Sequence, residues 1–205
     1  MGRTKGSRNA DFELSRAKLL DLLGQRLVDP DGVGASLREL AEAAGVSTAT
    51  VRHYFKDREA LIEAYLEHCN LQGARYLLLV TSEPLQASAA ASLRWTLEMI
   101  HLGLERGPLG KIHALGLRAG LESPKLGPAY LRTLLEPTLG CVEVRIERHQ
   151  ARGELVGRDP RLLALQIVSP LLLAMLHQRS LFGCDLRPLD VRALIDALID
   201  SVASA

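Results

Sequence analysis

Short hydroxyl and cationic side chains follow one another closely in the stretch GVSTATVRHYFKDREAL, which runs from Gly45 to Leu61. Its hydroxyl groups can donate to phosphate oxygens or to base edges without holding a helix away from a groove. The N-terminus of a helix also favours a phosphate group. The pattern therefore indicates a nucleic-acid interface, and the alternative is the solvated outside of a helix pair. The hydroxyl residues are Ser47, Thr48 and Thr50, and they are followed by Arg52, His53, Lys56 and Arg58.

Arg58 adds a second indication. It falls in the first turn of the helix that we expect to begin after Asp57. A cation in that place opposes the helix macrodipole, at a cost of a few tenths of a kcal/mol. A phosphate beside Arg58 would remove this conflict, so we interpret Arg58 as a phosphate contact.

Two short helices must position these side chains. The spacing of Leu37, Leu40, Ala41 and Ala44 puts four apolar residues on one helical face, and Val51 and Phe55 share a face of the next helix. The three residues from Gly45 to Ser47 have the length of a helix-turn-helix turn. Ala41 permits close approach of the helices, Gly45 permits a left-handed turn and Val51 fills the space between them.

The rest of the chain also predicts helices. No run of alternating apolar and polar residues is bounded by hairpin turns, so we expect an all-α fold of about nine helices. Caps, glycines and prolines place their limits. The predicted ranges are 11–27, 36–44, 47–55, 57–82, 85–105, 109–121, 124–152, about 160–182 and 188 onward.

Composition limits the classes of function. The net charge is only +1, so affinity for nucleic acid has to come from a local patch. The three cysteines, at 69, 141 and 184, form neither a disulfide framework nor a zinc spacing. The six histidines show no metal-binding motif, and GxGxxG, P-loop and nucleophile-elbow motifs are absent. We therefore expect no enzyme, no metal site and no cofactor.

The N-terminal stretch MGRTKGSRNA predicts a flexible basic arm over residues 1–10, with Arg3 and Lys5 as further DNA contacts. It lacks the apolar run of a signal peptide. The longest apolar run, Leu162 to Leu176, predicts a buried helix because it is too short to span a bilayer. We expect a cytoplasmic protein that does not bind membranes.

The segment LRELAEAAGVSTATVRHYFKDREALIEAYL resembles the TetR family of transcriptional repressors. The resemblance implies that Thr48, Ala49 and Thr50 face the major groove. It also implies that Arg38 reaches a base or a phosphate and that Tyr54 contacts the DNA backbone. The chain departs from the family pattern at two positions. Arg52 replaces the usual tyrosine, and Arg58 replaces the usual lysine.

The resemblance further predicts a DNA-binding domain over residues 11–56 and a ligand-binding and dimerisation domain over 57–205. Five residues of the second domain are candidates for an effector pocket, and their alternative is an ordinary core position. The last two long helices are strongly apolar, so we expect them to form a homodimer interface, the alternative being packing within one subunit. The pocket candidates are Trp95, Met99, His113, Tyr130 and His177, and the interface candidates are Leu171, Met175, Leu194 and Leu198.

These expectations combine into one hypothesis about function. A dimer binds a palindromic operator in double-stranded DNA, and a largely apolar small molecule releases it. The alternative is a helical adaptor protein whose helix-turn-helix is structural and has no specific DNA target.

Overall fold

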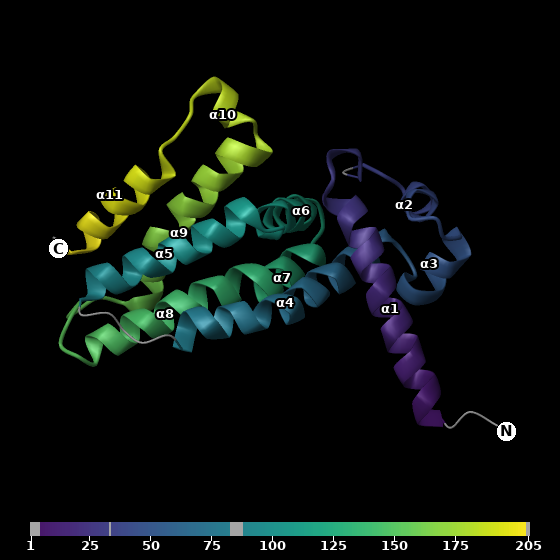
Figure 1. Ribbon diagram of the computed structural model, residues 1–205, viewed down its shortest axis with the longest axis horizontal. Coiled ribbons are helices and arrows are strands. Elements are labelled where there is room, and N and C mark those ends of the chain that lie inside the picture. Colours follow the sequence, from purple (N-terminus) through teal and green to yellow (C-terminus); the bar gives the residue numbers. More distant parts are fainter. Residues whose placement is uncertain (1–4, 33, 83–87, 204–205) are drawn as a thin grey trace. The chain divides into compact units, whose positions relative to one another are not determined.

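The computed structural model describes residues 5–32, 34–82 and 88–203 (Figure 1). Within these ranges every regular secondary-structure element is a helix, which confirms the predicted all-α class. The α-helices are α1 Lys5–Val28, α2 Leu37–Ala43, α3 Thr48–Phe55, α4 Arg58–Ser82, α5 Ala89–Arg106, α6 Leu109–Glu122, α7 Leu126–Tyr130, α8 Glu136–Gln150, α9 Pro160–Met175, α10 Gly183–Leu186 and α11 Val191–Ala203.

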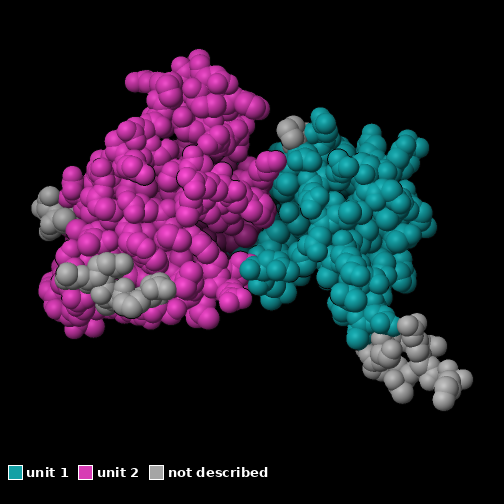
Figure 2. Space-filling model, viewed as in Figure 1, with its two compact units in different colours: residues 1–72, 115–133 teal, residues 73–114, 134–205 magenta. Residues whose placement is uncertain are grey.

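The chain divides into two compact units (Figure 2). Unit 1 comprises residues 1–72 and 115–133, and unit 2 comprises residues 73–114 and 134–205. Three helical segments contribute residues to both units, because α4, α6 and the helical run from α7 to α8 continue through the divisions.

In unit 1, α1 carries a buried apolar stripe of Leu19, Leu20, Leu23 and Leu27. These side chains form a core with Leu40, Val51, Phe55, Leu61 and Ile62 from the next three helices. Gly24 lets α1 approach α4 closely, since a Cβ built there would lie 1.9 Å from Cε2 of the Tyr65 ring. The core of unit 1 therefore holds α2 and α3 against two longer helices.

In unit 2, α5 packs against α8, α9 and α11, and α9 also packs against α8 and α11. The core is aliphatic and includes Leu97, Val142, Ile167, Leu171 and Ile199. It also buries one arginine completely. The Arg145 guanidinium donates to Ser92 Oγ at 3.0 Å and to the Val80 carbonyl at 2.6 Å, and it lies over the Trp95 ring.

Several boundaries differ from the predicted ones. The first helix begins at Lys5 rather than Asp11, so residues 5–10 of the expected arm are helical. The expected seventh helix is one run in three parts, because a π-helical turn at Leu131–Leu135 joins α7 to α8. Pro137 follows that turn and has no N–H to donate, which accounts for the irregularity.

The helix that contains the apolar run near the C-terminus has close to its predicted range of about 160–182. The helix continues past Met175 through a second π-helical turn, so Pro160–Ser180 forms 21 residues that by length and composition alone are apolar enough to cross a membrane. The expectation that the run is too short to span a bilayer is therefore wrong. Its inner side packs into the core of unit 2, as a core helix does. The buried residues on that side include Leu163, Ile167, Val168 and Leu171.

Candidate nucleic-acid interface

The turn between α2 and α3 has the predicted geometry. Ser36 caps α2 in a capping box, in which its hydroxyl accepts from Glu39 N and its own N–H donates to the Glu39 carboxylate at 2.7 Å. These hydrogen bonds hold the pKa of Glu39 below its usual value. Gly45 adopts φ +68°, and its N–H donates to the Glu42 carbonyl at 3.0 Å. The left-handed glycine ends α2 and lets the chain turn into α3.

Helix α3 is fixed at its start and along one side. Ser47 caps α3 by accepting from Thr50 N at 3.0 Å, and the Ser47 and Thr50 hydroxyls lie 2.8 Å apart. Val51 is fully buried and Phe55 is 3% exposed. The predicted anchors therefore occupy the core, and the opposite side of α3 stays available to a partner.

The remaining predicted contacts lie at the surface of this helix pair. We refer to these predicted contacts as the row. Tyr54 and Thr48 are half-buried, and the other side chains of the row are exposed. The exposed ones are Arg38, Ser47, Ala49, Thr50, Arg52, His53 and Lys56. Together they combine hydroxyl, imidazole and cationic groups on one short, well-capped helix and its flanks, which is a chemistry suited to phosphate and base edges. Of the predicted arm contacts, Arg3 and the Lys5 side chain lie outside the described residues.

An aromatic cluster covers the C-terminal half of α3. The ring of Phe12, from α1, lies 4.8 Å from the Tyr54 ring and 5.9 Å from the His53 ring, centroid to centroid. The His53 and Tyr54 rings are themselves 5.0 Å apart. Phe12 was not among the predicted site residues, although it continues the stripe of Arg16, Leu19 and Leu23 toward the N-terminus at helical spacing.

Arg58 has a protein partner that the sequence did not indicate. Its Nε donates to the Ala35 carbonyl at 3.0 Å, which ties the start of α4 to the residue before the α2 cap. Burial lowers the pKa of Arg58, the charge of Arg118 lowers it further, and Glu122 acts in the opposite direction. Arg58 therefore braces the helix pair, and its phosphate contact stays a prediction.

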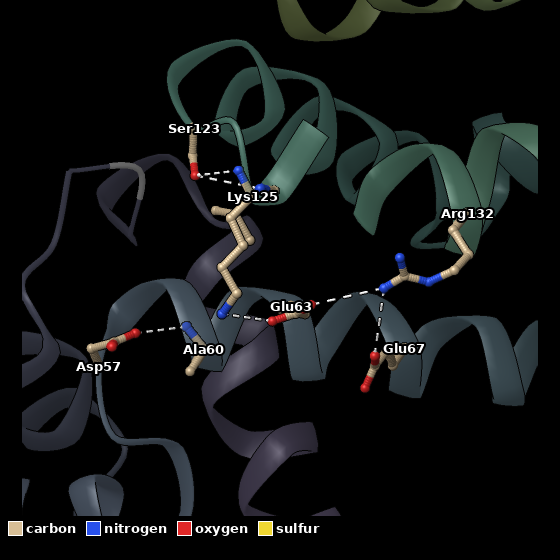
Figure 3. A network of polar contacts seen from close by, with 8 residues as sticks. Asp57, Ala60, Glu63, Glu67, Ser123, Lys125 and Arg132 are labelled. Carbon is tan, nitrogen blue, oxygen red and sulfur yellow. Dashed lines mark hydrogen bonds and ion pairs between the residues drawn. The ribbon is translucent and has the colours of Figure 1, made fainter. Parts of the chain in front are cut away.

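A network of ion pairs joins the first half of α4 to the segment from Ser123 to Arg132 within unit 1 (Figure 3). Lys125 Nζ lies 2.8 Å from Glu63 Oε2, and Arg132 Nη2 lies 3.8 Å from Glu63 Oε1 and 3.9 Å from Glu67 Oε1. Ser123 Oγ accepts from the backbone N–H groups of Lys125 and Leu126 and so orders the turn that presents the lysine. The network secures α4, the helix that follows α3.

The five pocket candidates fall in both units. Tyr130 belongs to unit 1, where it is 4% exposed, and burial raises its pKa to about 12. In unit 2, His113 is 2% exposed and burial lowers its pKa to about 4. Trp95 and Met99 are half-buried beside the unit 2 core, and the half-buried His177 has its Nδ1 2.7 Å from Gln178 Nε2. Several of these side chains thus have packing or hydrogen-bonding roles of their own.

The interface candidates divide into two pairs. Leu171 is fully buried and Met175 is 4% exposed, because both point from α9 into the core of their own subunit. A second copy therefore cannot reach these two side chains. Leu194 and Leu198 of α11 are half-buried, and the outward side of α9 exposes Leu162 and Leu173 instead.

Sequence comparison relates the N-terminal part of the chain to known regulators. The profile of the family described as "Bacterial regulatory proteins, tetR family" matches residues 31–65. The HTH-type transcriptional regulator BetI of Paraburkholderia phytofirmans is 38% identical over 56 residues, which are 27% of this chain and 29% of the relative. BetI of Burkholderia cenocepacia is 40% identical over 57 residues, again 29% of its length. The chain thus matches less than a third of the length of these relatives.

Structural comparison extends over the whole fold. A TetR-family transcriptional regulator from Mesorhizobium loti aligns with a TM-score of 0.72 and 21% identity, covering 98% of both chains. FadR from Bacillus subtilis, solved in complex with stearoyl-CoA, aligns at 0.67 and 18%, covering 91% of this chain and 96% of its own. SmeT, the repressor of a Stenotrophomonas maltophilia multidrug efflux pump, aligns at 0.63 and 19%, covering 92% and 88%. At these identities the likeness establishes the fold.

Proposed function

The chain belongs to the TetR family of transcriptional regulators, and we propose that it is a ligand-responsive repressor that binds a palindromic DNA operator as a homodimer. The observation that carries the proposal is the exposed row on α3. Buried Val51 and Phe55 hold the helix, and the Ser47 cap presents its N-terminal end. The relatives are regulators and not enzymes, and we place this protein in the cytoplasm with its DNA.

In this proposal the side chains of the row have separate roles. Thr48, Ala49, Thr50 and Arg52 read base edges in the major groove, and Arg52 replaces an aromatic contact with a fork that suits guanine. The phosphate contacts, which set affinity more than sequence preference, come from a second group. That group comprises Arg38, Ser47, His53, Tyr54, Lys56 and Arg58, with Arg3 and Lys5 of the N-terminal segment.

The homodimer is proposed from the outward side of α9. Leu162 and Leu173 are 66% and 64% exposed, and both lie on the side of this apolar helix that the subunit core does not cover. Half-buried Leu194 and Leu198 of α11 add apolar area. Two helix-turn-helix elements related by a two-fold axis would match a palindromic operator. A Leu173→Glu variant, altered at an exposed position, should therefore sediment as a monomer while keeping its helical content.

The effector is proposed to be a largely apolar small molecule bound among the helices of unit 2. FadR, which shares the fold, was solved in complex with stearoyl-CoA, a molecule with a long apolar acyl chain, and this supports the proposal. An effector releases DNA only if it binds the DNA-free state more tightly than the DNA-bound state. The side chains that we would substitute first all belong to unit 2 and are Trp95, Met99, His113 and His177.

Selection from a random duplex library tests the DNA-binding proposal. The wild-type protein should enrich a palindromic duplex, bind it in the nanomolar range and lose affinity steeply with salt. Thr48→Ala and Arg52→Ala should lose preference at particular base pairs, whereas Lys56→Ala should weaken all sequences alike and reduce the salt slope by about one. Failure to enrich any sequence would favour the alternative, a helical adaptor with a structural helix-turn-helix.

A further inference from the structure

Phe12 is a surface aromatic residue whose position the core of unit 1 does not explain. The buried stripe of α1 begins at Leu19 and continues through Leu27. Phe12 precedes Leu19 by about two helical turns and is 37% exposed. Since α1 already supplies its core residues further along, burial of apolar area gives only a partial reason for an aromatic side chain here.

The contacts of Phe12 are made with the exposed part of α3. Its ring lies edge-on to the His53 ring, with an interplanar angle of 81°, and tilted by 34° against the Tyr54 ring. The His53 and Tyr54 rings meet at 76°. Each of the three rings thus contacts the other two, and two of them belong to the proposed DNA-binding row.

One turn further along α1, Arg16 makes a different kind of contact. Its Cζ lies 5.4 Å from the centroid of the Phe55 ring, which is buried in the core of unit 1. Two successive turns of α1 therefore contact α3, and each contacts different residues of it. Arg16 acts on the buried anchor, and Phe12 acts on the two aromatic side chains at the surface.

We propose that Phe12 is a positioning residue for DNA binding, which holds the Tyr54 hydroxyl and the His53 imidazole ready to donate to phosphodiester oxygens of the duplex. The inference rests on the proposed function. Side chains that sample several rotamers in the free protein lose entropy when DNA orders them, and a neighbouring ring that restrains them beforehand reduces that loss. The ring of Phe12 supplies this restraint from a helix outside the helix-turn-helix.

The first test compares Phe12→Ala with Leu14→Ala, a matched truncation of an α1 side chain that is 57% exposed. The probe is the palindromic duplex that the wild-type protein selects from a random library. We expect Phe12→Ala to bind about five- to tenfold more weakly per half-site, given the usual strength of an aromatic pair. Leu14→Ala should bind like wild type. The salt slope of Phe12→Ala should be unchanged, because no charge is removed.

A double-mutant cycle decides whether Phe12 acts through its two neighbours. In a background that carries Tyr54→Phe and His53→Ala, Phe12→Ala should cause almost no further loss of affinity. Phe12→Tyr should restore binding, whereas Phe12→Leu, which keeps apolar volume without a ring, should restore only part of it. Equal losses in both backgrounds would overturn the inference, as would a loss explained by a lower unfolding midpoint of Phe12→Ala.

The two proposals fail in different ways. If the wild-type protein selects no duplex, the proposed function fails and the positioning role fails with it. If the wild-type protein selects a palindrome and Phe12→Ala binds it equally well, only the positioning role fails.

Discussion

Lys125 Nζ lies 2.8 Å from Oε2 of Glu63, so an ion pair joins the turn before α7 to the second turn of α4 (Figure 3). The hydrogen bond to Glu63 raises the pKa of Lys125. Arg132 approaches the other oxygen of the same carboxylate. Glu63 is therefore the centre of the network. Removing its carboxylate takes a partner from two cations, whereas removing Lys125 takes a partner from one carboxylate.

We predict that Glu63→Gln lowers the free energy of unfolding modestly, by about 0.5–1 kcal/mol, because partly exposed ion pairs contribute little. The effect should vanish near 1 M salt, where the Debye length is about 3 Å. Urea unfolding at low and high salt measures it. Glu98→Gln, at an exposed position on α5, is the control. A difference between Glu63→Gln and wild type that survives high salt would show that packing, and not charge, is responsible.

Two glycines in open surroundings should respond to alanine in opposite directions. A Cβ at Gly45 or at Gly73 would meet nothing within 4 Å, but only Gly45 has a positive φ, at +68°. Gly45→Ala should therefore destabilise by about 1–2 kcal/mol through backbone strain. Gly73→Ala, inside α4, should stabilise by about 0.5–1 kcal/mol. Thermal unfolding of both variants checks this, and equal signs would contradict the assigned turn.

The buried His113 should make stability depend on pH. Burial lowers its pKa from 6.5 to about 4, so the unfolded chain binds a proton between these values while the folded chain does not. The stability contribution is therefore complete above about pH 6.5 and is lost as pH falls toward 4, with a slope approaching 1.4 kcal/mol per pH unit. Denaturant unfolding across this range should show a shallower slope for His113→Gln than for wild type. Parallel curves would assign the pH dependence to other groups.

The buried guanidinium of Arg145 should contribute strongly to the stability of unit 2. Arg145→Met would leave the Val80 carbonyl and the Ser92 hydroxyl without the donors that now reach them at 2.6 and 3.0 Å. We expect a loss of about 2–4 kcal/mol, the usual cost of breaking a buried polar arrangement from one side. Arg192→Met, at an exposed position of α11, is the matched control. An unfolding free energy equal to that of the control would refute the structural role.

The helix-turn-helix was predictable because its determinants are local. The cap at Ser47, the turn at Gly45 and the core face of Val51 each depend on residues within a few positions, and the structure confirms all three. The end of α4 at Ser82 was also predicted, since Pro84 follows it in the sequence. Long-range partners were not predictable in this way, because nothing near Arg58 in the sequence indicates the carbonyl of Ala35.

The apolar residues of α9 likewise show that sequence does not indicate which distant group covers a side chain. Periodicity marks Leu171 and Met175 as apolar, but it does not distinguish a residue covered by its own subunit from one covered by a second copy. Only the packing of α9 against α5, α8 and α11 turns these two inward and leaves Leu162 and Leu173 outside. A helix that is apolar nearly all round has no single direction that its sequence could indicate.

The sequence by itself determined the all-α class and the capped helix α3, since capping, turn formation and helical periodicity act over a few residues. It also carried the family resemblance, in the stretch from Leu37 to Leu66. The tertiary structure alone decided which distant groups meet: Phe12 with Tyr54, Lys125 with Glu63, and Arg145 with Val80. Each of these contacts depends on how whole helices pack, and helix packing is set by the combined burial of many side chains and not by the two residues that finally touch.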